Sequence, residues 1–371
     1  MIPGPMARFR AVAGMSARPG ALAAYPWSGQ EGCFDSAGAA IPCAGTGQDG
    51  AFRPGRPWPA PRFELVGETL VLDRLAGLSW PRDASAAPWP MTLEEAQAWI
   101  AERNAQIWLG HADWRLPTRR ELLSLVSLAH ARPALPPGHP FKNIFQHWHW
   151  TSSPAASAPG HFWRVHLEGG RMFPGPGDAR HMVLPVRGRS WLPPETPELA
   201  LGAGHHWPEP RFERAGEAVL DRLTGLTWRG EVLPEGGEDA FHRLTKQAWR
   251  GATQPESGQG VLDRLTGLTW RGEVLPGSGE ATWAEALEAA ERTPGWRMPT
   301  IWELESLVDA SRARPALAPG HPFGPELDGV WSSTSSGYDP AWAWVLYFGK
   351  GAVGVGHKPG RHFKFLLTKD A

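Results

Sequence analysis

Asparagine, tyrosine and cysteine are scarce in this chain. Its 371 residues include 3 Tyr and 2 Cys, and Asn stands only at Asn104 and Asn143. Both cysteines, Cys33 and Cys43, lie in one Gly-rich stretch near the N-terminus. Two cysteines without a histidine at zinc-finger spacing do not complete a tetrahedral zinc site. They form a disulfide if the compartment is oxidising, and otherwise they remain two ordinary thiols.

Long runs of charge or of apolar residues are also absent. The formal net charge is -1 and the pI is near 6.9, so we expect no nucleic-acid partner. No stretch reaches the roughly 18 consecutive apolar residues that span a bilayer, so we expect no membrane insertion. Residues 1–24 are apolar, but Arg8, Arg10 and Arg18 interrupt them, which makes this segment a poor signal peptide.

Signatures of catalysis are missing as well. The Gly-x-Ser-x-Gly nucleophile motif does not occur, and no Gly-x-Gly-x-x-Gly stands between a predicted strand and a helix. No cysteine lies beyond Cys43. We therefore expect no enzyme activity and no cofactor. The high Gly and Pro content, 44 and 38 residues, is typical of GC-rich genomes, including those of thermophiles.

The most informative feature that is present is an internal repeat. Trp-Arg-Leu-Pro-Thr at 114–118 returns as Trp-Arg-Met-Pro-Thr at 296–300, and residues 131–141 return at 313–323 with one difference. A repeat at fixed spacing indicates a duplicated module. We predict an N-terminal lead-in with the Cys pair at 1–60, a first module at 61–190, a Pro-rich linker at 191–209 and a second module at 210–371.

A younger duplication lies inside the second module. The sixteen residues at 219–234 are identical to those at 261–276. Only one copy can occupy the native position in the fold. The copy at 261–276 leads directly into the next predicted helix, so we assign it to the fold and the other copy to an extra hairpin or surface insertion.

Each module changes from a strand pattern to a helix pattern and back. A hairpin with a positive-φ turn at Gly77 or Gly267 comes first. Four Thr-x-x-Glu capping boxes then predict two helices per module, because the Thr and Glu side chains satisfy the first free amides of a helix; they begin at Thr92, Thr118, Thr282 and Thr300. Strand-like segments complete each module. The fold class is therefore α+β, in two tandem copies.

Several polar groups have a structural as well as a chemical interpretation. The Arg and Glu of Trp-Arg-x-Pro-Thr-x-x-Glu resemble a catalytic pair, but helix capping already explains the Glu. Asp73-Arg74 and Asp263-Arg264 fit hairpin turns, in which Asp bonds to turn amides. Module one also holds a group of histidines that are candidate metal ligands on strands. Module two has no comparable group, so we predict no metal site; the histidines are His147, His149, His161, His166 and His181.

These motifs together resemble a known family. The blocks Val-x-Asp-x-x-Thr-Gly-Leu-x-Trp, Trp-Arg-Leu-Pro-Thr-x-x-Glu-Leu and Trp-Ser-Ser-Thr are similar to those of the C-terminal domain of Legionella collagen-like protein. The stretch from Cys33 to Gly50 is similar to the lead-in of that family. The resemblance implies a C-type-lectin-like fold, of the type shared with formylglycine-generating enzyme, and a binding or adhesion function. The cysteines that formylglycine-generating activity needs are absent from both modules.

Module two also resembles the variable proteins of diversity-generating retroelements, whose ligand-facing residues change at template adenines. Residues compatible with AAC template codons follow Trp331 and form the expected variable surface. They are Gly337, Tyr338, Asp339, Leu346, Tyr347, Gly349, Ala352, Gly354, Gly356, His357, Gly360, Arg361 and His362. Five residues of this segment are incompatible with such codons, so we expect them in the scaffold: Trp342, Trp344, Lys350, Lys358 and Lys364.

The resemblance leaves some matters open. Module one ends in Val183-Leu-Pro-Val-Arg187, as the family usually does, whereas module two has Phe363-Lys-Phe-Leu-Leu-Thr368, which leaves the register of the last strand open. The predicted function is binding of a protein or surface ligand through a diversified surface. The alternative is an adhesin or polysaccharide-binding lectin of fixed specificity. We expect display at a cell or virion surface.

Overall fold

The computed structural model describes residues 25–192, 195–196, 275, 279–319, 321, 323 and 327–370, together with the strands at 212–215, 218–221, 226–229, 261–263 and 268–270. Residues 1–24, most of the predicted linker and the turn residue Gly267 lie outside these ranges. Every helix within them is too short or too polar to cross a lipid bilayer.

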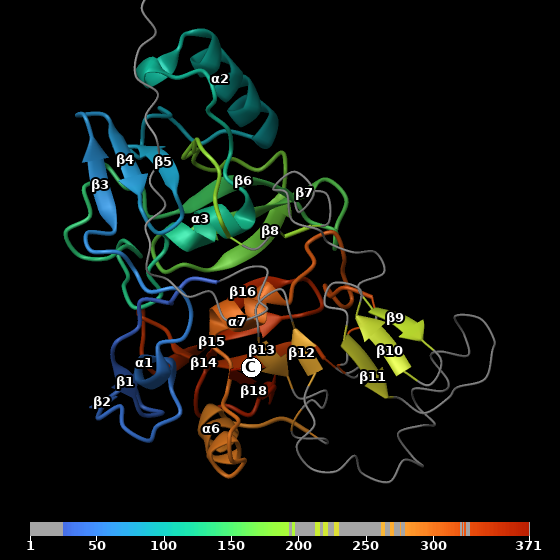
Figure 1. Ribbon diagram of the computed structural model, residues 1–371. Coiled ribbons are helices and arrows are strands. Elements are labelled where there is room, and N and C mark those ends of the chain that lie inside the picture. The colour runs from blue at the N-terminus through green and yellow to red at the C-terminus, as the bar shows by residue number, and fades with distance from the viewer. Residues whose placement is uncertain are drawn as a thin grey trace, which may run out of the picture.

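The two modules repeat the same order of elements, and the mixture of helices and sheets confirms the α+β class (Figure 1). Module one contains β3 (Phe63–Val66), β4 (Leu70–Asp73), β5 (Leu78–Pro81), α2 (Leu93–Ala105), the 3₁₀ turn Trp108–Gly110, α3 (Arg119–Leu125), β6 (Trp148–Pro154), β7 (His161–His166) and β8 (Met172–Pro176). Module two contains β12 (Val261–Asp263), β13 (Leu268–Trp270), α6 (Trp283–Glu291), α7 (Ile301–Ser306), β14 (Gly329–Ser335), β15 (Trp342–Tyr347), β16 (Ala352–His357), β17 (Lys364–Phe365) and β18 (Thr368–Asp370).

All four predicted capping boxes are confirmed, at α2, α3, α6 and α7. At α3, the Glu121 backbone N–H donates to the Thr118 hydroxyl at 3.3 Å, and the Thr118 N–H donates to the Glu121 carboxylate at 2.8 Å. The same carboxylate also pairs with Arg115 at 2.7 Å. Glu121 therefore caps a helix and anchors Arg115, which forms a β-bridge with Val186, and this is the structural interpretation of the Arg–Glu motif.

The copy of the younger duplication at 261–276 lies in the native position. β13 pairs Thr269 with Lys369, and in module one the bridge between Ser79 and Arg187 occupies the corresponding place. The other copy, β10 (Ala218–Asp221) and β11 (Leu226–Arg229), forms a sheet of its own with β9 (Phe212–Ala215). The bridge of Arg297 to Thr368 matches that of Arg115 to Val186, so the last segment of module two keeps the register of the last segment of module one.

The modules share one seven-stranded sheet, in the order β17-β14-β15-β16-β8-β7-β6. Corresponding residues in this part of the chain, such as Trp150 and Trp331, lie 181 positions apart. The two halves of the sheet join where Met172 of β8 pairs antiparallel with Val353 of β16, and these residues also lie 181 positions apart. An antiparallel pair between equivalent residues is the signature of a twofold axis, so the modules pack as a symmetric dimer does.

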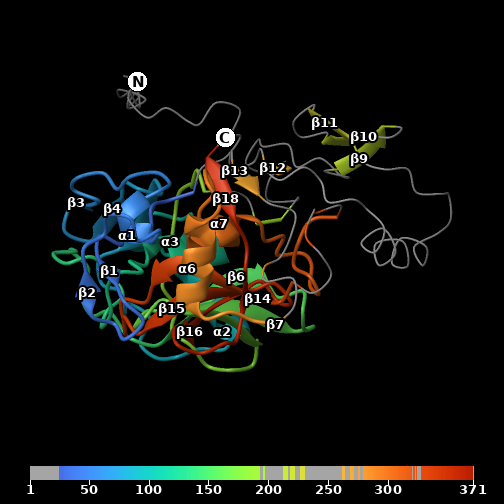
Figure 2. The same ribbon diagram turned by 90° about the horizontal axis from the view of Figure 1, so that it is seen from below.

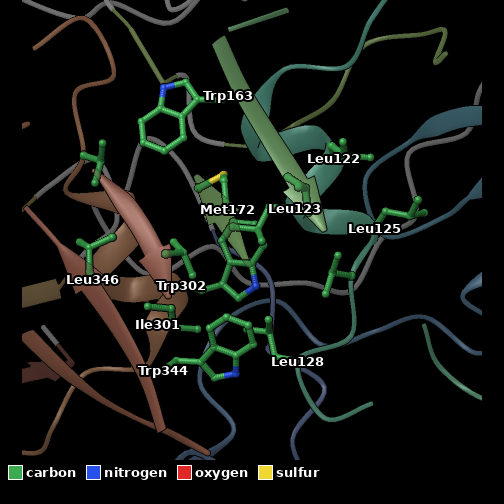
Figure 3. Close-up of a cluster of buried hydrophobic side chains, with 14 of the residues drawn as sticks. Leu122, Leu123, Leu125, Leu128, Trp163, Met172, Ile301, Trp302, Trp344 and Leu346 are labelled. Atoms are coloured by element: carbon green, nitrogen blue, oxygen red, sulfur yellow. The ribbon is translucent and has the colours of Figure 1, made fainter. Parts of the chain in front are cut away.

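We call the boundary between the two modules, where β8 meets β16, the seam. The hydrophobic core is continuous across it (Figure 3). Leu122 and Leu123 of α3 meet Ile301 and Trp302 of α7, and Trp344 of β15 completes the contact. Each of these side chains is at most 3% exposed. The length of the chain predicts a core for each module, and each module does bury a smaller cluster of its own, around Trp150 in module one and around Trp331 in module two. The largest cluster combines residues of both modules.

A buried charge cluster lies in the middle of this apolar interface. Arg119 and Arg120 of α3 both bind the Glu305 carboxylate of α7, at 2.6 and 2.7 Å, and all three side chains are 0–2% exposed. Arg120 also donates to the Glu305 and Val308 carbonyl oxygens at 2.8 Å. Glu195 completes the cluster through the Ser153 hydroxyl and the Arg120 amide. Burial raises the pKa of Glu195.

We predict that Glu305→Ala lowers the free energy of unfolding by about 3–5 kcal/mol, because it leaves two guanidinium groups buried without their shared carboxylate. Urea denaturation of the full chain measures this loss. Arg292→Ala, which removes an exposed ion pair with Glu288, is the control and costs less than about 1 kcal/mol. Equal losses in the two variants would show that water, not Glu305, solvates the arginines.

Candidate functional site

Two pockets open at the seam between the modules. The first, which we call the Tyr338 pocket, has a volume of about 420 Å³ and is lined by Glu168, Gly169, Arg171, Ser336, Tyr338, Asp339, Trp342 and Val355. The second, the Tyr347 pocket, has a volume of about 760 Å³ and is lined by Ser157, Ala158, His161, Phe173, Pro174, Arg314, Pro315, Leu327, Asp328, Tyr347, Gly349, Lys350 and Ala352. Both modules contribute to each pocket.

Two exposed aromatic side chains stand in the Tyr338 pocket. Tyr338 is 46% exposed and Trp342 is 36% exposed. The Arg132 guanidinium of module one lies over the Tyr338 ring at 4.5 Å and donates to its hydroxyl at 2.5 Å. Glu168 lies 3.6 Å from the same guanidinium. Module one therefore holds the Tyr338 ring in place from the opposite side of the seam.

The predicted variable residues separate into three groups in space. Tyr338 and Asp339 line the Tyr338 pocket, and Gly337 precedes them in the same loop. Tyr347, Gly349 and Ala352 line the Tyr347 pocket. The remaining predicted variable residues lie on β15, on β16 and in the loop after β16. They are Leu346, Gly354, Gly356, His357, Gly360, Arg361 and His362.

The expectation that the variable residues face solvent is wrong for four of them, because Leu346, Ala352, Gly354 and Gly356 are buried. Leu346 and Ala352 are both 0% exposed and belong to the core shared by the modules. Leu346 belongs to the same cluster of buried side chains as Trp302 and Trp344 (Figure 3). A codon argument carries no information about which face of a strand is buried, and this is why it selected them.

Two of the glycines are fixed by close packing. A Cβ on Gly337 would collide with the Ala129 carbonyl carbon and lie 2.5 Å from the His130 amide nitrogen, both of module one. A Cβ on Gly356 would collide with the Phe363 ring and lie 2.6 Å from Trp331. The backbone at Ala129 and the buried Trp331 ring cannot move aside, so these positions favour glycine for steric reasons.

The loop after β16 is the most accessible part of the predicted surface. His357, Arg361 and His362 are exposed. The His357 ring lies 5.2 Å from that of Trp342, which joins this loop to the Tyr338 pocket. Arg361 pairs with Glu285, the capping residue of α6. Trp342 was expected in the scaffold, but its exposure and position place it on the surface.

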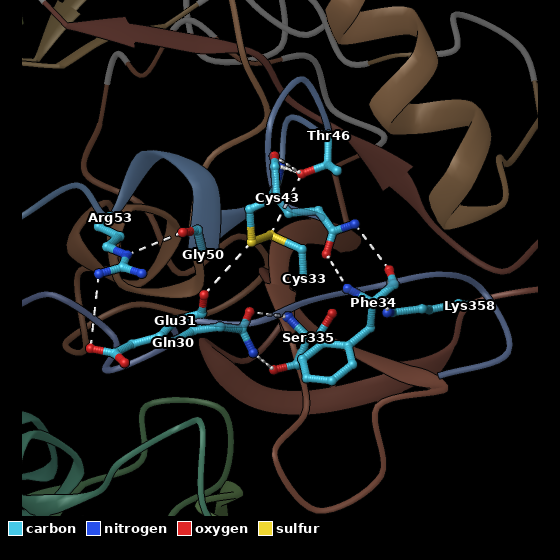
Figure 4. The surroundings of a disulfide bond; sticks show 11 residues. Gln30, Glu31, Cys33, Phe34, Cys43, Thr46, Gly50, Arg53, Ser335 and Lys358 are labelled. Atoms are coloured by element: carbon cyan, nitrogen blue, oxygen red, sulfur yellow. Dashed lines mark hydrogen bonds and ion pairs between the residues drawn. A yellow bond between two sulfur atoms is a disulfide. The ribbon is translucent and has the colours of Figure 1, made fainter. Parts of the chain in front are cut away.

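The lead-in packs against module two as well as against module one, where the Leu128 amide donates to the Ser28 carbonyl oxygen at 3.2 Å. It contains β1 (Cys33–Phe34), β2 (Ala40–Ile41) and α1 (Asp49–Phe52), and α1 contacts β14. Cys33 and Cys43 form a disulfide. The Gln30 side chain exchanges two hydrogen bonds with the Ser335 backbone, at 2.7 and 2.8 Å (Figure 4).

Ionisable groups are buried where the lead-in meets module two. Asp49 accepts a hydrogen bond from the Thr334 hydroxyl at 2.7 Å, and burial raises the pKa of Asp49 to about 6. The Lys358 ammonium donates to the Asp35 carbonyl at 3.1 Å and lies 3.9 Å from the Trp283 ring centre. Burial lowers the pKa of Lys358 to about 7. Lys358 thus belongs to the scaffold, as expected.

The histidines of module one lie near one another, and the His147 and His166 rings are 5.3 Å apart. Burial lowers the pKa values of His149, His166 and His181 to about 4. His181 bonds to Arg164 at 2.6 Å, whereas His166 packs edge-on against Trp148. Among the described residues, no group of three or more His, Cys, Asp or Glu is arranged to hold a metal ion.

The sequence pointed to module two alone, and it missed the turn of module one at Glu168 and Arg171 that lines the Tyr338 pocket. A signal for this turn was present. Glu168-Gly-Gly-Arg171 corresponds to Gly349-Lys-Gly-Ala352, so the turns of the two modules have diverged in charge. A turn whose sequence differs between the two copies is a position where the scaffold tolerates changes of side chain.

Comparison with known proteins identifies the repeated unit. A family model described as the Lcl C-terminal domain matches residues 69–187 and again residues 259–367. The two matches cover the two modules and begin, in module two, at the copy of the hairpin that lies in the native position. No curated protein matches the chain.

We predict that Gly337→Ala lowers the free energy of unfolding by about 1–3 kcal/mol, because its Cβ meets the backbone of module one. Thermal and urea denaturation measure the change. Tyr338→Ala, at the exposed neighbouring position, is the control and costs less than about 1 kcal/mol. If Gly337→Ala were as stable as the parent, the backbone of module one would have to move to accommodate a side chain at this position.

We also predict that Lys358 makes stability depend on pH. Its pKa in the folded chain, about 7, is below the usual 10.5, so the neutral amine contributes stability above about pH 10.5. That contribution is lost as the pH falls through about 7. The difference in unfolding free energy between the parent and Lys358→Met should therefore move in favour of the parent from pH 7 toward pH 10. The exposed Lys350→Met should show no such change, and a flat difference for Lys358→Met would contradict the prediction.

Proposed function

Because the chain belongs to the Lcl C-terminal domain family, we propose that it is a ligand-binding protein and not an enzyme, and that each module has a C-type-lectin-like fold. The single observation that carries the binding function is the Tyr338 pocket. Two large aromatic side chains, Tyr338 and Trp342, are exposed there beside the Asp339 carboxylate. Exposed Tyr and Trp in a pocket are the side chains that most often dominate binding energy.

The preferred form of this function is a diversified surface on module two. Five codon-compatible residues are exposed and adjoin the Tyr338 pocket or the loop after β16, and they are Tyr338, Asp339, His357, Arg361 and His362. Two residues incompatible with AAC codons, Trp344 and Lys358, are fully buried. Trp344 and Lys358 thus support a scaffold that stays constant beneath side chains that vary, whereas the exposed Trp342 and Lys350 and the buried Leu346 and Ala352 depart from this separation. Display at a cell or virion surface stays a prediction.

A fixed-specificity adhesin or polysaccharide-binding lectin is the alternative. Close packing at Gly337 and Gly356 favours it, because a mutagenised segment would place side chains at positions without space for them. A row of partly exposed rings also favours it. Phe173 and Tyr347 lie 6.3 Å apart, and Tyr347 and Phe363 lie 5.7 Å apart, on one face of the shared sheet.

Deep sequencing of the gene and its flanks tests the preferred form. We expect a near-copy of the segment coding for residues 330–371, with differences only opposite adenines of that copy. We further expect those differences to concentrate at the five exposed positions and to spare Gly337 and Gly356. Absence of a near-copy, or differences at all four bases, would leave the fixed-specificity alternative.

The binding function itself is tested by glycan and protein arrays with the full chain. Trp342→Ala should reduce any saturable signal at least about tenfold, since central aromatic residues contribute about 2 kcal/mol or more. Trp89→Ala is the matched control, because Trp89 is 60% exposed and lies outside both seam pockets. A signal that falls equally in both variants, or in neither, would place the ligand elsewhere.

A further inference from the structure

The two seam pockets are copies of each other. Strand pairs on both sides keep the offset of 181 residues, since Val165 pairs with Met172 as Leu346 pairs with Val353. The same offset relates seven of the eight residues of the Tyr338 pocket to residues that line the Tyr347 pocket. Glu168, Gly169, Arg171, Tyr338, Asp339, Trp342 and Val355 correspond to Gly349, Lys350, Ala352, Ser157, Ala158, His161 and Pro174.

The chemistry of the two copies differs. Tyr338, Asp339 and Trp342 are replaced by the smaller Ser157, Ala158 and His161. The second pocket is correspondingly larger, about 760 Å³ against about 420 Å³. Pockets of this size hold small-molecule ligands. The duplicated backbone cradle is therefore retained, whereas its side chains have changed.

Positive charge gathers in the Tyr347 pocket. Lys350 and Arg314 are exposed, line the pocket and have no ion-pair partner among the described residues. The Arg314 amide donates to the Gly349 carbonyl at 3.1 Å, which fixes the position of its backbone beside the pocket. The one carboxylate there, Asp328, accepts the Gly349 amide at 3.3 Å. His161 adds a third group that can bind an anion.

Flat apolar surface lies next to these charges. The Phe173 and Tyr347 rings are 6.3 Å apart and inclined by 46°, so neither ring covers the face of the other. Both rings rest against Gly354, where a Cβ would lie 2.9 Å from each of them. The rings are partly exposed and line the pocket. A planar ring of a ligand can stack on them while an anionic group reaches Lys350 or Arg314.

We propose that the Tyr347 pocket is a second binding site, which takes a small molecule that carries a phosphate or carboxylate on a planar ring. This site shares Tyr347, Gly349 and Ala352 with the surface of the proposed function. Its defining charges, Lys350 and Arg314, lie outside the predicted variable residues. The protein thereby has two binding sites that share one duplicated backbone arrangement but differ in the side chains that line them.

Isothermal titration of the full chain with three probes tests this site. Phenyl phosphate carries both the ring and the anion, phenol carries the ring and inorganic phosphate carries the anion. We expect phenyl phosphate to bind at least about tenfold more tightly than either of the others, because the two contacts are made by one molecule. No saturable binding of phenyl phosphate up to about 10 mM would overturn the proposal.

Matched variants locate the binding. Lys350→Ala should weaken phenyl phosphate about threefold, and Lys350→Ala with Arg314→Ala about tenfold, as expected for exposed charge contacts. Arg171→Ala removes a charge from the Tyr338 pocket and should leave the affinity unchanged. An effect of Arg171→Ala without an effect of Lys350→Ala would overturn the assignment. The gene-sequencing test of diversification does not depend on either result.

Discussion

The pairing of Arg119 and Arg120 with Glu305 is the interaction on which the joined modules depend. The helices that carry these residues are equivalent, yet one supplies both cations and the other supplies the carboxylate. The position equivalent to Glu305 in α3 is Leu123, and those equivalent to the arginines in α7 are Ile301 and Trp302. Two copies of module one packed in this way would bury four arginines without a carboxylate. The seam is therefore specific for unlike partners, although its backbone keeps the symmetry of a dimer.

Local structure followed from the sequence because its causes are local. A capping box is completed within four residues, so Thr92, Thr118, Thr282 and Thr300 announce their helices without reference to the rest of the chain. The shared sheet was not predicted, because pairing of Met172 with Val353 depends on two modules meeting in space. The contact of the lead-in with module two escaped prediction for the same reason.

The site was predicted in part. The codon pattern found Tyr338 and Asp339, which line a pocket, but it also selected the buried Leu346 and Ala352 and assigned the exposed Trp342 to the scaffold. The codon pattern shows which residues can arise from an AAC template codon. It gives no information about the face of the sheet on which those residues lie. The contribution of Glu168 and Arg171 required the fold, since their turn reaches the pocket only across the seam.

The attachment of the lead-in to module two also sets an order of events during synthesis. The partners of Asp49 and Gln30 are Thr334 and Ser335, and Tyr25 donates to Glu303 at 2.5 Å. A ribosome makes the first members of these pairs long before the second. The early residues bond to water until their partners, which lie 278–305 positions later in the sequence, have been made. Docking of the lead-in on module two therefore follows synthesis of Ser335, so these contacts form late in folding.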